Sequence, residues 1–147
     1  METPASVAKH PIHPMLIGIP IGLWLFSLAC DLLSLLPQAS DNWKIVAFYS
    51  MAGGIIGAFV AAIPGLIDML SLPKPLKNIA LTHMTLNLTV IALYVANVWL
   101  RSHAVQTMTP LWLSIAAVLL LGVSGWLGGK MVYEHGVGVQ PPAGPAS

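Results

Sequence analysis

The chain has 147 residues, of which 56% are hydrophobic and only 7% are charged, with a formal net charge of +1 at pH 7. Soluble domains carry about 25% charged residues, so this composition excludes an ordinary soluble protein and indicates an integral membrane protein. The small net charge provides no basic surface for nucleic acid. The single cysteine, Cys30, excludes a disulfide framework within the chain.

Four apolar runs each reach the roughly 20 residues that a helix needs to cross the hydrocarbon core of a membrane. They span residues 15–36, 45–72, 79–100 and 111–132. Pro64 interrupts the second run, and Pro110 precedes the fourth run at a position that suits the start of a helix. Short loops between the runs predict antiparallel neighbours. We therefore expect an all-α, four-transmembrane-helix bundle of up-down-up-down topology.

We expect residues 1–147 to form a single membrane domain, because no internal repeat is strong enough in the sequence to divide it. The first apolar run is long enough to span a membrane, so no cleaved signal peptide is predicted. The tail at residues 136–147 is rich in glycine and proline, which is typical of a flexible end.

Lysine and arginine are distributed unevenly between the two ends of the predicted bundle. One end has four of these residues and the other has two, and an excess of positive charge marks the cytoplasmic side. This bias predicts that both termini are cytoplasmic. The larger group consists of Lys9, Lys74, Lys77 and Lys130, and the smaller consists of Lys44 and Arg101.

Histidines gather at the same end. His10 and His13 lie at the start of the first run, where a proline follows each of them and is expected to keep it out of a regular helix. His83 lies just over one turn inside the third run, and His135 follows the fourth. Asp68 lies near the end of the second run, also at this end. Ionisable residues inside or at the edge of an apolar zone are candidates for function.

Several neutral imidazoles at one end of a helical bundle suit a metal centre. Haem iron can be held by two histidines, and zinc, copper or non-haem iron can also use them, with Asp68 adding a carboxylate. Asn87 follows His83 by four residues on the same helix face, where it can orient the imidazole, bind a ligand or simply bond to a neighbouring helix. A quinone site is a further use of such histidines. Covalent haem attachment is excluded because the chain has no Cys-x-x-Cys-His motif.

Other interpretations stay open. The histidines can be interfacial anchors or helix caps, and small residues at Gly53, Gly57 and Ala61 can serve close helix packing, within the chain or in a larger membrane complex. No catalytic motif is present, so a redox carrier is favoured over a catalyst. A carrier of ions or protons is the least favoured class. Its polar path to the far end would consist of Asn97, Asp31, Arg101 and His103.

The chain resembles the DUF2231 family of small bacterial predicted membrane proteins. The resemblance rests on His10-Pro11-Ile12-His13-Pro14, on residues 63–68 (Ile-Pro-Gly-Leu-Ile-Asp), on His83 and on residues 125–139. Family members are similar to the membrane portion of proteins that also carry a Rieske-type iron–sulfur domain. The resemblance therefore implies electron transfer in a bacterial inner membrane, with haem b as cofactor. No Cys-x-His pair is present here, so a Rieske partner would be a separate polypeptide.

These observations predict a site for haem b, with zinc, copper or non-haem iron as alternatives. His83 is the first candidate ligand, and the second is His13, His10 or His135; the sequence does not choose among these three. Asn87 and Asp68 are expected to set the orientation of the imidazoles. The expected partners are the lipid bilayer, a Rieske protein, cytochrome or quinone, and a larger complex or a second copy of the chain.

Overall fold

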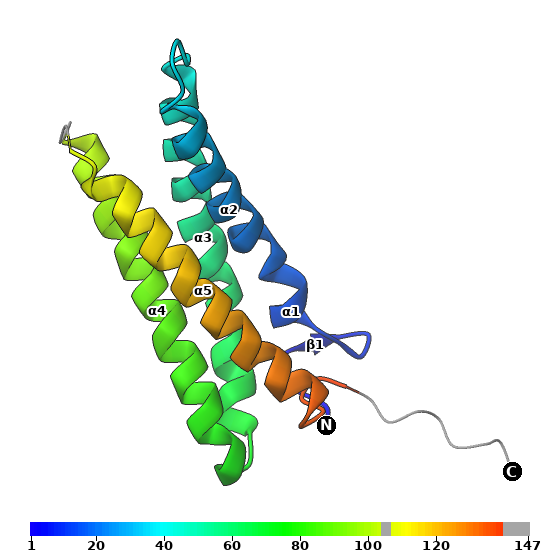
Figure 1. Ribbon diagram of the computed structural model, residues 1–147. Helices are drawn as coiled ribbons and strands as arrows, with labels where there is room; N and C mark the ends of the chain where they lie inside the picture. The colour runs from blue at the N-terminus through cyan, green and yellow to red at the C-terminus, as the bar shows by residue number, and fades with distance from the viewer. Residues whose placement is uncertain (104–106, 140–147) are drawn as a thin grey trace, which may run out of the picture.

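The computed structural model describes residues 1–103 and 107–139, and its long elements are helices. Figure 1 shows these helices side by side, with consecutive long helices running in alternate directions. Four stretches are long and apolar enough to cross a membrane, which confirms the all-α membrane class. The elements are β1 Ser6–Val7, β2 His10–Pro11, α1 Ile12–Leu16, α2 Gly18–Leu33, α3 Asn42–Ser71, α4 Lys74–Ser102 and α5 Thr109–Tyr133.

Prolines disturb the helices less than their positions in the sequence predict. α1 begins at Ile12, so His13 lies inside a helix and the expectation that Pro14 excludes it is wrong. The first turn tolerates proline, because its N–H groups have no partner within the helix. Pro64 does not interrupt α3, which continues to Ser71. Of the two histidines that precede a proline, only His10 lies outside the helices, as Pro11 predicts.

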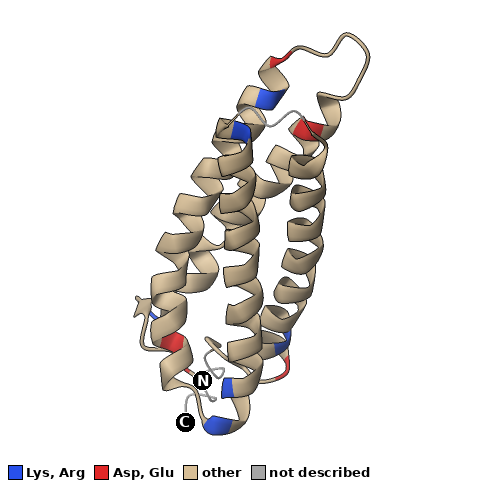
Figure 2. Cartoon of the chain, turned by 90° about the vertical axis from the view of Figure 1, so that its left-hand side faces the viewer, with Lys and Arg blue, Asp and Glu red and all other residues tan. Residues whose placement is uncertain are grey.

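The bundle is built from two helical hairpins. α2 packs along α3 in the first hairpin, and α4 packs along α5 in the second. The hairpins then meet through α3 with α4 and, less closely, through α2 with α5, so that α2 and α4 lie diagonally opposite. Figure 2 shows the charged residues gathered at the two ends of the bundle, with an uncharged middle. This is the charge distribution that a membrane-spanning bundle requires.

A small β-hairpin closes the end that carries the termini. β1 and β2 pair antiparallel around Ala8 and Lys9, both of which have positive φ, as tight hairpin turns require. The backbone N–H of Ala5 donates to Asp68 Oδ1 at 2.8 Å and ties this segment to α3. The amino group of Met1 donates to the carbonyl of Gly136 at 2.7 Å. Most of the predicted flexible tail, residues 140–147, lies outside the described residues.

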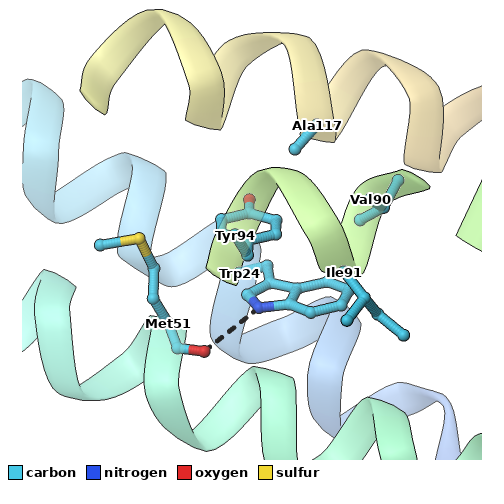
Figure 3. Packing of buried hydrophobic residues seen from close by; sticks show 6 residues of the cluster. All are labelled: Trp24, Met51, Val90, Ile91, Tyr94 and Ala117. Carbon is cyan, nitrogen blue, oxygen red and sulfur yellow. Dashed lines mark hydrogen bonds between the residues drawn. The ribbon is translucent and has the colours of Figure 1, made fainter. Parts of the chain in front are cut away.

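The core at the centre of the bundle is organised around two stacked aromatic rings. Figure 3 shows Trp24 and Tyr94 together with the residues that enclose them. Their ring centroids are 4.5 Å apart and their planes differ by 9°. The Trp24 indole N–H donates to the carbonyl of Met51, and a side chain at Gly54 would collide with the indole. The Tyr94 hydroxyl is buried and has no partner among the described residues.

The two hairpins carry equivalent residues, although the sequence shows no obvious repeat. Three pairs of residues, each 70 positions apart, face one another across the bundle. A hydrogen bond inside each hairpin also corresponds. Ser27 donates to the Ala47 carbonyl in the first hairpin, and Asn97, 70 positions after Ser27, donates to the Pro110 carbonyl in the second. The bundle is therefore a structural duplication with approximate two-fold character. The three facing pairs are His13–His83, Trp24–Tyr94 and Asp31–Arg101.

The pair Asp31–Arg101 joins the hairpins at the end away from the termini. Arg101 Nη1 and Nη2 donate to the two carboxylate oxygens of Asp31 at 2.9 and 2.7 Å, and Arg101 Nε donates to Asn97 Oδ1 at 2.8 Å. Both charged side chains are largely buried. Charge-assisted, bidentate bonds of this kind are strong and directional.

We predict that Asp31→Ala lowers the free energy of unfolding by about 3–5 kcal/mol, because it leaves the Arg101 guanidinium buried without its counter-ion. Because the two positions are structurally equivalent, the exchange Asp31→Arg/Arg101→Asp is expected to recover a large part of this loss. Denaturant unfolding in detergent measures both effects. An exchange variant that is no more stable than Asp31→Ala would contradict the proposed equivalence.

A paired-histidine candidate site

His13 and His83 face each other inside the bundle, near the end that carries the termini. Their ring centroids are 6.4 Å apart and their planes are nearly perpendicular, at 88°. His13 belongs to α1 and His83 to α4, so each hairpin contributes one imidazole. Both residues lie within stretches that are apolar enough to cross a membrane. The duplication of the hairpins thus places two equivalent imidazoles in one site.

The His13 ring rests on the backbone of α3. Its Nδ1 lies 2.8 Å from the carbonyl oxygen of Ala61. A Cβ on Gly65 would lie 2.8 Å from the same nitrogen, so only glycine leaves room for the ring in this position. In a regular α-helix, the carbonyl of residue 61 and the N–H of residue 65 are hydrogen-bonding partners. Because Gly65 has no side chain, the sequence Pro64-Gly65 therefore leaves the backbone of α3 accessible to the imidazole.

The His83 ring rests on α5 in the same way. Its Nδ1 lies 2.8 Å from the carbonyl oxygen of Ser124 and 3.0 Å from the Ser124 hydroxyl. A Cβ on Gly128 would lie 3.2 Å from the ring, closer than side chains normally pack. Ser124 and Gly128 are four residues apart, as are the corresponding residues of the first hairpin. The two histidines therefore use the same arrangement of carbonyl and glycine on the neighbouring helix.

These contacts determine where each neutral imidazole carries its proton. A carbonyl oxygen only accepts hydrogen bonds, so the Nδ1 of each ring is the donor and Nε2 keeps its lone pair. The side-chain amide of Asn87 donates to His83 Nε2 at 3.0 Å and also to the His83 carbonyl. His13 Nε2 has no partner among the described residues. The pair therefore presents lone pairs on Nε2, one of which is covered by an amide.

The other candidate residues lie elsewhere. His10 is exposed in β2, with Nδ1 2.8 Å from the Ala8 carbonyl, and His135 is exposed beyond the end of α5. Asp68 accepts the Ala5 N–H, and the structure shows no bond from it to an imidazole. His103 lies at the opposite end against Trp99. Of the three candidate partners for His83, the structure brings only His13 into ring contact with it.

Within residues 1–103 and 107–139, no group of three or more histidine, cysteine, aspartate or glutamate side chains is arranged to hold a metal ion. Zinc sites use three or four protein ligands, so this part of the chain does not supply a zinc site by itself. Haem iron needs only one or two axial ligands from the protein. The two imidazoles match haem in the number of protein ligands required.

Sequence reasoning missed the parts of the site that are not titratable. Each histidine ring contacts a backbone carbonyl, that of Ala61 or of Ser124, and also the glycine four residues after it. A signal was available, because Gly65 and Gly128 lie in the two motifs that carry the family resemblance.

Comparison with known proteins gives one match. The model of a family described as predicted membrane protein (DUF2231) matches residues 9–141 and confirms the resemblance inferred from the motifs. No curated protein and no solved structure matches the chain.

We predict that Gly65→Ala lowers the free energy of unfolding by about 1–3 kcal/mol, because the added methyl group displaces the His13 ring from the backbone. Gly128→Ala is expected to do the same to His83. The matched controls are Gly18→Ala and Gly122→Ala, where a Cβ meets no atom within 4 Å. Thermal unfolding in detergent measures all four variants. Equal effects in the tight and open positions would show that the histidines do not depend on these glycines.

Proposed function

We propose that this chain, which belongs to the DUF2231 family of membrane proteins, is an electron-transfer protein that holds haem b between His13 and His83. The observation that carries this proposal is the facing pair of imidazoles, each fixed through Nδ1 to a backbone carbonyl. Histidine ligands commonly donate their second ring N–H to such a group, which fixes the ring and makes the ligating nitrogen more basic.

The spacing of the rings supports the proposal. Two imidazoles bound on opposite sides of one metal ion, with metal–nitrogen distances near 2.0–2.1 Å, have ring centroids about 6 Å apart. The observed separation of 6.4 Å lies close to that value. Axial imidazoles also tolerate any angle between their ring planes, because each ring needs only to direct its nitrogen at the metal. Haem would supply reversible one-electron chemistry at this position.

Neighbouring residues complete the proposed site. Asn87 covers His83 Nε2, so its amide has to turn away when that nitrogen binds a metal. In the turned position it can still donate to the His83 carbonyl and keep the helix in place. Lys9, Lys74 and Lys77 belong to the same end of the bundle and are assigned to the haem propionates.

The proposed location is the bacterial inner membrane with both termini in the cytoplasm. The motive is the excess of lysine at the end that carries the termini. In this orientation the histidine pair lies near the cytoplasmic surface. A redox partner would be a separate protein or a small molecule: a Rieske protein, a cytochrome or a quinone.

An accessory role within a larger membrane complex is the second candidate. Gly18 and Gly22 on α2, and Gly122 and Gly125 on α5, are exposed and have no neighbouring atom where a side chain would begin. Small residues on outer faces let another helix approach closely in lipid. A homo-oligomer would use the same faces.

The haem assignment predicts a Soret band and a reduced-minus-oxidised difference spectrum for protein purified from haem-sufficient cells. His13→Ala and His83→Ala are each expected to lose bound haem, because each removes one axial ligand. The matched controls His10→Ala and His135→Ala should keep it. Folded, purified protein that stays colourless even after reconstitution with haem would contradict the proposal, and bound zinc or copper in that sample would favour another metal.

The orientation is tested by labelling with a membrane-impermeant thiol reagent. Ser40→Cys and Asn78→Cys are introduced separately into a Cys30→Ala background. Ser40 is exposed in the connection between α2 and α3, and Asn78 is exposed near the start of α4 at the opposite end. Ser40→Cys should react from the periplasm, and Asn78→Cys only after the inner membrane is opened. The reverse pattern would place the termini in the periplasm. Labelling of both from one side would contradict the alternating topology.

A further inference from the structure

The end of the bundle opposite the histidines is hollowed by a cleft of about 800 Å³ between the two hairpins. This size falls within the range of about 300–1,000 Å³ that is usual for small-molecule sites. α2 and α3 provide one wall, and α4, α5 and the residues just before α5 provide the other. The lining is mixed: somewhat more than half of it is apolar, and Asp31, Arg101 and Lys44 are its charged members.

Hydrogen-bond donors remain available on Arg101. Three of its five N–H groups are used, two by Asp31 and one by Asn97. The other two have no partner among the described residues, and the side chain lines the cleft. The guanidinium is held rigidly by these bonds, so the unused donors are fixed in direction. The cleft therefore offers oriented donors to a ligand that carries oxygen acceptors.

Both positive side chains of the cleft are paired with carboxylates. Arg101 is paired with Asp31, and Lys44 lies 3.2 Å from the carboxylate of Asp41, which lies outside the cleft lining. A phosphate or carboxylate would therefore have to compete with Asp31 and Asp41 for these positive charges. An uncharged head group with carbonyl oxygens fits better, because it accepts hydrogen bonds without needing a counter-ion. The apolar walls, among them Ile45, Phe48 and Leu111, suit a hydrocarbon tail.

We propose that this cleft binds a lipid-soluble quinone, with a carbonyl oxygen of its ring accepting hydrogen bonds from the Arg101 guanidinium. The choice of quinone among uncharged amphiphiles rests on the proposed function, because quinone is the one lipid-soluble small molecule among the redox partners proposed there. The stacked rings of Trp24 and Tyr94 lie between the cleft and the histidine pair along the helices. The cleft is thus a second site, separate from the proposed haem site.

The test is equilibrium binding of decylubiquinone to the purified full-length chain in detergent, measured by dialysis against quinone in the same micelles. Ile45→Trp fills the cleft without touching the ion pair, and it should weaken binding by about tenfold or more. Ile56→Trp is the matched control, because Ile56 is also exposed on α3 but does not line the cleft. Arg101→Lys keeps the positive charge but removes the planar guanidinium with its several N–H donors, and it should also weaken quinone binding.

Saturable binding that Ile45→Trp abolishes and Ile56→Trp leaves unchanged supports the inference. Binding that partitions without saturation, or that is equal in the two tryptophan variants, overturns it. Saturable binding of an anionic phospholipid in place of quinone also overturns it. Binding does not require haem, so a protein that binds quinone but stays colourless would refute the proposed haem site alone. A protein with haem and an empty cleft would refute the quinone site alone.

Discussion

The bundle depends on polar contacts made between helices inside an apolar shell. In hydrocarbon, a polar group that finds no partner within the protein costs several kcal/mol, since no water replaces it. Here the imidazoles bond to backbone carbonyls of a neighbouring helix, and Asn97 bonds to the start of α5. Arg101 bonds to both carboxylate oxygens of Asp31. These contacts set which helix faces meet, while the surface that faces lipid carries large apolar side chains such as Ile56 and Leu119.

The duplication of the hairpins explains why these contacts come in pairs. Equivalent positions meet at three levels along the bundle and carry different kinds of pair. The first pair consists of two histidines, the second of tryptophan and tyrosine, and the third of two opposite charges. Two like charges at that third level would repel one another, so divergence to Asp31 and Arg101 turns an equivalent pair into a bond between the hairpins.

The fold was predictable from the sequence because span length and hydropathy decide it. The four helices appear where the apolar runs predict them, including the second run, which continues through Pro64. The error lies at His13, where the rule for residues before proline gave way to a helix that starts at Ile12. The site was predictable only in part. Titratable residues at one end were visible, but the choice of His13 over His10 and His135 depends on which side chains reach the bundle axis. The repeat was invisible because most equivalent residues differ in identity.

The paired site requires His13 and His83 to carry a proton on Nδ1, where each ring bonds to a backbone carbonyl, and to present an unprotonated Nε2 to the site. Nitrogen-15 NMR of histidine-labelled protein in detergent at neutral pH, with His13→Gln and His83→Gln to assign the signals, tests this directly. The account predicts a protonated Nδ1 and an unprotonated Nε2 for both rings before any metal is added. Signals of the opposite tautomer would show that the carbonyl contacts do not form, and a doubly protonated ring would have no lone pair on Nε2 for a metal. Either result would contradict the paired site.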